Sequence, residues 1–156
     1  LFVYAHRYHA HTPGSWTAGE VSDLSGGMPL FCMPAQLTMP LLLRWMLVFE
    51  DSAGETLQLA RAVPRRWMGG DQAIEIRSAP TRWGRVDVRL QPDGGHGVAG
   101  EVTLPERMPG AVWLSLRAPE GKRLDEVRID GVLAKERHGE SVRLSGRSTH
   151  ITATFT

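Results

Sequence analysis

The sequence predicts a mainly β fold, an antiparallel β-sandwich of about eight strands preceded by a short helical segment. After residue 55, apolar residues alternate with polar ones, which is the period of strands with one buried face. Turn residues divide this region at short intervals, as in Pro92-Asp93-Gly94-Gly95. A sandwich needs roughly 100 residues. We therefore assign residues 53–156 to the sandwich and residues 1–52 to the helical segment.

The helical segment has two expected parts. Residues 2–11 are rich in aromatic residues and histidine, and we expect them to end a helix before the turn signal Pro13-Gly14. A second helix is predicted over residues 35–50, which are apolar on nearly every side, as in a buried helix. Pro40 falls inside it and should kink or restart it. Residues 51–54 then end it.

Within the sandwich, the strand pattern starts at residue 55. A single helical turn is expected at residues 64–68, and residues 94–97 suit a hairpin loop. Each predicted strand carries apolar residues at alternate positions: Leu57 and Leu59; Ile74 and Ile76; Val86, Val88 and Leu90; Val102 and Leu104; Val112, Leu114 and Leu116; Val127 and Ile129; Val142 and Leu144; Ile151, Ala153 and Phe155.

Composition excludes several classes of partner. The chain has 18 basic and 17 acidic residues and a net charge of +1, so it lacks the basic surface typical of nucleic-acid binding. Its longest apolar run, residues 39–49, contains Pro40 and Arg44 and is shorter than the roughly 20 residues that span a bilayer. We expect a soluble protein with no membrane partner, in the cytoplasm, the periplasm or outside the cell. Because the chain starts at Leu1, inside an apolar run, we expect it to be the C-terminal part of a larger protein.

No metal or other cofactor is expected. Cys32 is the single cysteine, which excludes an internal disulfide and a cysteine-built zinc site. His6, His9 and His11 lie close together in sequence, but they lack the third ligand and the spacing of known metal motifs. Histidines that hydrogen-bond within a packed helix end explain this cluster better than a metal site does.

The same segment suits a sugar site. The indole of Trp16 can stack on the apolar face of a pyranose ring, while His9 and His11 can bind its hydroxyls. Glu20 is the candidate catalytic acid or base. Glycoside hydrolysis normally uses two carboxylates, and the first fifty residues offer only Glu20, Asp23 and Glu50. We therefore expect the partner of Glu20 to lie upstream.

Three tryptophans of the sandwich are candidates for binding glycans. Trp113 alternates with inward residues of its strand and should lie on the outer face, as a binding platform or covered by the helical domain. Trp67 and Trp83 lie beside arginines in the sequence, where guanidinium stacking is a sufficient structural explanation.

Several motifs resemble a known architecture. The segments Leu114-Ser-Leu-Arg-Ala-Pro119 and Val127-Arg-Ile-Asp-Gly131 are similar to a strand and hairpin in the C-terminal β-sandwich of bacterial (α/α)6-toroid glycoside hydrolases, such as arabinofuranosidases, fucosidases and rhamnosidases. The segments Gly14–Glu20, Cys32–Leu37 and Trp45–Glu50 resemble the end of the toroid. The resemblance implies that residues 1–52 are the remnant of a truncated (α/α) domain. It also implies glycan processing in the toroid's cup, with His9, His11, Trp16 and Glu20 as lining candidates.

Three functions stay open. The first is the C-terminal part of a glycoside hydrolase that acts on an oligo- or polysaccharide, with an upstream helical catalytic domain and the sandwich as an accessory. The second is the C-terminal region of a polysaccharide lyase, in which Tyr4, Arg7, Tyr8 and His9 supply the base and neutralise a uronate carboxylate. The third is a non-catalytic sandwich that binds glycans or buttresses its neighbour. We expect the chain to be inactive in isolation.

Overall fold

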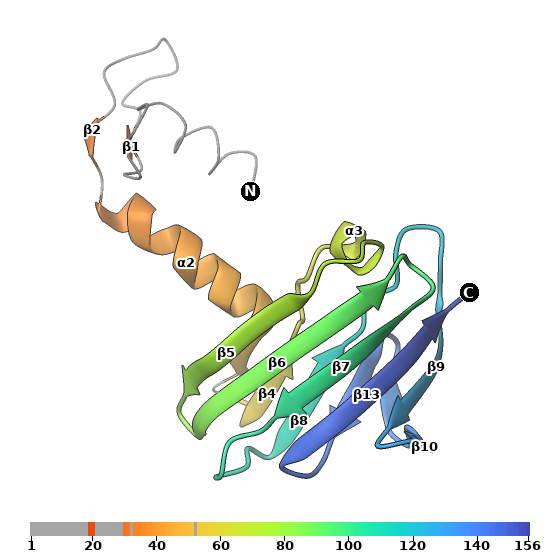
Figure 1. Ribbon diagram of the computed structural model, residues 1–156. Helices are drawn as coiled ribbons and strands as arrows, with labels where there is room; N and C mark the ends of the chain where they lie inside the picture. The colour runs from red at the N-terminus through yellow and green to blue at the C-terminus, as the bar shows by residue number, and fades with distance from the viewer. Residues whose placement is uncertain (1–18, 21–29, 32, 52) are drawn as a thin grey trace. The chain divides into compact units, whose positions relative to one another are not determined.

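The computed structural model describes residues 19–20, 30–31, 33–51 and 53–156 (Figure 1). The chain divides into two compact units, residues 1–44 and residues 45–156. In the first unit, β1 (Gly19–Glu20) pairs antiparallel with β2 (Leu30–Phe31), and helix α2 (Met33–Leu47) begins. The second unit contains the end of α2 and two larger sheets.

The two larger sheets confirm the predicted mainly β sandwich. Neighbouring strands are antiparallel except for the parallel pair β4–β8. The five-stranded sheet has the order β11 (Arg137–His138), β12 (Ser141–Leu144), β8 (Ala111–Ser115), β4 (Thr56–Leu59) and β3 (Val48–Asp51). The six-stranded sheet has the order β10 (Val132–Leu133), β9 (Leu124–Ile129), β13 (Ser148–Phe155), β7 (Gly97–Thr103), β6 (Gly84–Asp93) and β5 (Ile74–Thr81).

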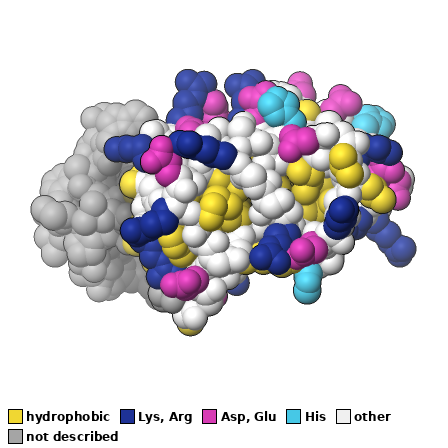
Figure 2. All heavy atoms as spheres, turned by 90° about the horizontal axis from the view of Figure 1, so that it is seen from below, with side chains coloured by type: hydrophobic (Ala, Val, Ile, Leu, Met, Phe, Trp, Pro, Cys, Tyr) yellow, Lys and Arg dark blue, Asp and Glu magenta, His cyan; other side chains and the backbone are white. Residues whose placement is uncertain are grey.

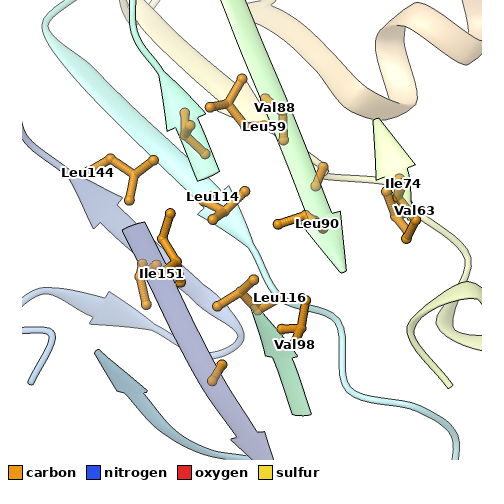
Figure 3. Packing of buried hydrophobic residues seen from close by; sticks show 14 of the residues in the cluster. Leu59, Val63, Ile74, Val88, Leu90, Val98, Leu114, Leu116, Leu144 and Ile151 are labelled. Atoms are coloured by element: carbon orange, nitrogen blue, oxygen red, sulfur yellow. The ribbon is translucent and has the colours of Figure 1, made fainter. Parts of the chain in front are cut away.

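The core consists of the inward apolar side chains of both sheets. Leu59, Leu114 and Leu116 face Val88 and Leu90 across the sandwich, as Figure 3 shows, and all five are almost completely buried. Burying one such side chain contributes about 1.5–3 kcal/mol. The predicted alternation therefore places the apolar face of each strand in one shared core.

The helix ends earlier than the sequence predicts. It stops at Leu47 instead of residue 50, and Val48–Asp51 form the edge strand β3. The backbone N–H of Ala60 donates a hydrogen bond of 2.8 Å to the carbonyl oxygen of Leu47. Val48 is fully buried opposite Leu59. Because these long-range contacts satisfy the backbone and bury the side chain, they override the helical pattern of the local sequence.

The prediction that the helix over residues 35–50 is buried is wrong for several of its residues. Leu41, Leu43 and Trp45 are between 37% and 43% exposed. Pro40 lies inside α2, which runs on as one helix from Met33 to Leu47.

The predicted turns are confirmed. The helical turn is α3 (Arg65–Met68), and its Met68 side chain is fully buried. Residues 94–96 connect β6 and β7, and Gly97 begins β7. Asp130 and Gly131 have φ angles of 50° and 80° and join β9 to β10 in a two-residue hairpin turn. Asp and Gly favour this turn because it needs two positive φ angles.

Candidate functional site

The predicted N-terminal site falls largely outside the described residues. The site residues that lie outside the described part of the chain are His9, His11 and Trp16, as well as Tyr4, Arg7 and Tyr8 of the lyase alternative. The backbone of Glu20 is described in β1, where it pairs with Leu30, but its side chain is not. The roles assigned to all these residues therefore stay predictions.

The outer face of the six-stranded sheet is charged. Glu75, Arg89, Glu101 and His150 occupy one row across β5, β6, β7 and β13. All four are exposed. Arg89 lies within ion-pair distance of Glu75, at 3.9 Å, and the imidazole of His150 lies 3.8 Å from the Glu101 carboxylate. Exposed cross-strand charges of this kind are typical of a surface in contact with water.

The outer face of the five-stranded sheet is different. Phe49, Gln58, Trp113 and Arg143 pair side by side on β3, β4, β8 and β12. They point outward, because the residues that alternate with them along the strands face the core. We call these four residues the aromatic row. Three inter-strand steps of about 4.8 Å give it a length of roughly 14 Å.

Neighbouring side chains hold the aromatic row in place. The guanidinium carbon of Arg61 lies 5.0 Å from the ring centre of Phe49, a cation–π contact. The rings of Trp113 and His138 meet edge to face, with centroids 4.8 Å apart and an interplanar angle of 78°. At the end of the row, Arg143 donates to Glu136 over 2.9 Å. The row thus offers two aromatic rings, one amide and one guanidinium on one face of the sheet.

Hydroxyl groups lie beside Trp113 on the same face. Ser115 is two residues further along β8, and its register partner on β12 is Ser141. The two hydroxyl oxygens are 2.9 Å apart, and His138 pairs with Ser141 from the next strand. Each hydroxyl can donate one hydrogen bond and accept two. This group therefore adds donors and acceptors next to the aromatic surface.

The position of Trp113 confirms the sequence prediction that it lies on the outer face of its strand. Phe49, Gln58 and Arg143 were not predicted as site residues. Phe49 lies inside the predicted helix. Gln58 and Arg143 belong to the row only because the strand order places β4 and β12 on either side of β8. The one signal for Gln58 was its outward position between Leu57 and Leu59.

The other two tryptophans of the sandwich have structural surroundings. The guanidinium of Arg82 lies 4.1 Å from the ring centre of Trp83, so the predicted arginine stacking is confirmed there. Trp67, on α3, packs partly buried against the core.

An ion-pair network fixes α3 to the rest of the sandwich. Arg65 donates two hydrogen bonds to the Glu140 carboxylate, at 2.7 and 2.8 Å, and one to the carbonyl of Ala118 at 2.6 Å. The backbone N–H of Ala118 also donates to Glu140 at 3.0 Å. The hydrogen bond from Arg65 holds the pKa of Glu140 below its ordinary value, and Glu140 in turn raises the pKa of Arg65. This network has a structural role.

Metal and membrane motifs are not seen in the described part of the chain. Its His, Cys, Asp and Glu side chains form no group of three or more that could hold a metal ion. Among its helices, none combines the length and the apolar character that a bilayer crossing requires.

Comparison with known proteins adds no assignment. No family model matches the chain, and no curated protein matches it.

Proposed function

We propose that the chain is part of a carbohydrate-active protein, a glycoside hydrolase, in which the sandwich is an accessory domain that binds glycan through the aromatic row. The observation that supports this proposal is the alignment of Phe49, Gln58, Trp113 and Arg143 across four strands of one outer sheet face. The opposite outer face carries an exposed row of charges instead.

The chemistry of the row suits a sugar chain. The C–H groups on one side of a pyranose ring form an apolar patch, which packs favourably on the electron-rich face of Trp113. The amide of Gln58 and the hydroxyl of Ser115 can both donate to and accept from sugar hydroxyls. Arg143 adds donors at the end of the row. A row roughly 14 Å long fits an extended oligosaccharide better than a single small molecule.

The experiment compares wild type with two tryptophan variants of the full 156-residue chain. Calorimetry with neutral hexasaccharides from β-glucan, xylan and arabinan should detect binding of at least one of them. Trp113→Ala should weaken that binding at least tenfold, which corresponds to about 1.4 kcal/mol. Trp45→Ala removes an exposed indole that lies outside the row and should leave the affinity unchanged. The proposal fails if no hexasaccharide binds, or if Trp113→Ala binds as tightly as wild type.

The catalytic part of the proposal rests on residues 1–52. Glu20 would act as acid or base, with His9, His11 and Trp16 against the sugar and a second carboxylate upstream. In the full-length parent, Glu20→Gln should abolish turnover of the glycan and leave binding by the aromatic row intact. Unchanged turnover by Glu20→Gln and by Trp16→Ala would show that this site is wrongly placed.

A further inference from the structure

A second surface feature lies where three connections between strands meet. These are the β5–β6 turn, the β7–β8 connection and the β12–β13 connection, and Figure 1 shows the first two at the same end of the sandwich. They enclose a groove of about 630 Å³. Trp83, Leu104 and Pro105 supply its apolar surface. We call it the arginine groove, because its lining includes Arg82, Arg85, Arg107 and Arg147.

The close approach of two of these connections depends on Gly84. Its φ angle is +131°, which side-chain-bearing residues rarely adopt, and a Cβ atom there would lie 3.1 Å from the Cβ of Pro105. Glycine therefore allows the β5–β6 turn to lie against the β7–β8 connection. The third connection is fixed by a backbone hydrogen bond of 2.7 Å from Leu104 to the carbonyl of Arg147.

Positive charge exceeds negative charge in the groove. Its lining holds four arginines and two carboxylates, Asp87 and Glu106. Glu106 pairs with Arg147 over 2.6 Å. Asp87 accepts a hydrogen bond of 2.7 Å from the backbone of Ser78. Figure 2, which looks onto this end of the sandwich, shows Lys and Arg side chains together with Asp and Glu side chains around hydrophobic patches.

Most side-chain N–H donors of the other three arginines, Arg82, Arg85 and Arg107, are unused. The guanidinium of Arg82 lies over Trp83 and donates one hydrogen bond of 3.0 Å to the carbonyl of Asp51. The backbone N–H of Arg82 donates a hydrogen bond of 2.9 Å to the Glu50 carboxylate. Arg85 donates from one nitrogen to Ser78. Arg107 is exposed and has no hydrogen bond or ion pair with any residue that the structure describes. A guanidinium has five N–H groups, so these side chains present many donors toward the groove.

We infer that the arginine groove binds the anionic groups of an acidic glycan. A guanidinium offers two parallel N–H donors, which match the two oxygens of a carboxylate or two of the terminal oxygens of a sulfate ester. Arg82 is already oriented by its ring contact and its carbonyl bond, so less side-chain freedom is lost when it binds an anion. The anion chemistry follows from the groove itself, whereas the sugar part of the inference rests on the proposed function.

The test measures binding of three hexasaccharides to the full chain: an oligogalacturonate, a sulfated β-glucan and the same β-glucan without sulfate. The double variant Arg85→Gln/Arg107→Gln should bind the acidic oligomers at least tenfold more weakly than wild type and the neutral one equally well. The affinities for the oligogalacturonate and for the sulfated β-glucan show whether the groove prefers carboxylate or sulfate. The matched control, Arg66→Gln/Arg123→Gln, removes the same charge from exposed positions outside the groove and should change each affinity less than twofold.

Two results would overturn the inference. In the first, neither acidic oligomer binds more tightly than the neutral one. In the second, the control variant loses as much affinity as the groove variant, which would mean that net charge alone attracts the anion. Failure of the proposed function gives a different result. In that case no neutral hexasaccharide binds, and Trp113→Ala does not change the affinity for any oligomer. The groove variant still weakens binding of the acidic oligomers. Thermal unfolding of every variant confirms that each one is folded.

Discussion

Replacing Glu140 by Gln should destabilise the sandwich measurably. The substitution removes the charge that accepts two hydrogen bonds from Arg65 and one from the backbone of Ala118. The two charged side chains are 31% and 35% exposed, so water screens part of their attraction. Exposed ion pairs contribute about 0.2–1 kcal/mol, and breaking a buried pair costs about 3–5 kcal/mol. The half-buried geometry therefore predicts a cost of about 1–2 kcal/mol.

Thermal unfolding of four proteins measures this cost: wild type, Glu140→Gln, Arg65→Gln and the double variant. In a chain of this size, 1–2 kcal/mol lowers Tm by roughly 2–8 °C. The double-mutant cycle should give a coupling energy of about 1 kcal/mol, because either single substitution already removes the ion pair. Purely additive effects of the two substitutions would refute the reasoning.

The same pair predicts how stability depends on pH. The pKa of Glu140 is lower in the folded state than in the unfolded chain. The stability that the ionised Glu140 contributes to the fold is therefore fully present above the ordinary carboxyl pKa, and it is lost as pH falls through the pKa of Glu140 in the folded state. The stability difference between wild type and Glu140→Gln should therefore shrink from neutral pH to about pH 3. A difference that stays constant over this range would contradict an ionised Glu140 in the network.

Three further substitutions test the packing, each by denaturant unfolding. Thr149 is fully buried, and its hydroxyl has no partner among the described residues, so Thr149→Val should stabilise the fold by about 1 kcal/mol; a loss would show that the hydroxyl is satisfied. Gly97→Ala should cost about 1–3 kcal/mol, because its Cβ would lie 2.5 Å from the carbonyl oxygen of Ala153. Gly70→Ala, with 3.6 Å to the nearest atom, is the control and should be nearly neutral. Leu114→Ala, at a fully buried position, should cost about 2–5 kcal/mol, and a cost below 1 kcal/mol would contradict its place in the core.

The sequence predicts most of the sandwich because alternation is a local signal. Leu57 and Leu59 show it within four residues, and both are fully buried in β4. The strand β3 was missed for the opposite reason. Val48 and Phe49 continue the apolar run of α2, and only their pairing with β4 makes this segment a strand.

The candidate site could be predicted only in part. Alternation alone places Trp113 on the outer face of β8. Phe49 and Gln58 join it through the strand order β3–β4–β8, in which β4 and β8 run parallel although more than fifty residues separate them. The arginine groove likewise needs three connections to meet. Local patterns report which face a residue occupies, but they carry no information on which distant strand lies beside it.

The most direct test of the aromatic row follows the five indole N–H signals by NMR during titration with the neutral hexasaccharide that binds. Trp113→Ala assigns one of these signals, and Trp67, packed against the core, serves as the internal reference. We predict that the indole of Trp113 and the backbone N–H of Gln58 shift together along the titration, while the indole of Trp67 does not move. Binding that leaves both Trp113 and Gln58 unshifted would contradict the assignment of this face as the glycan-binding surface.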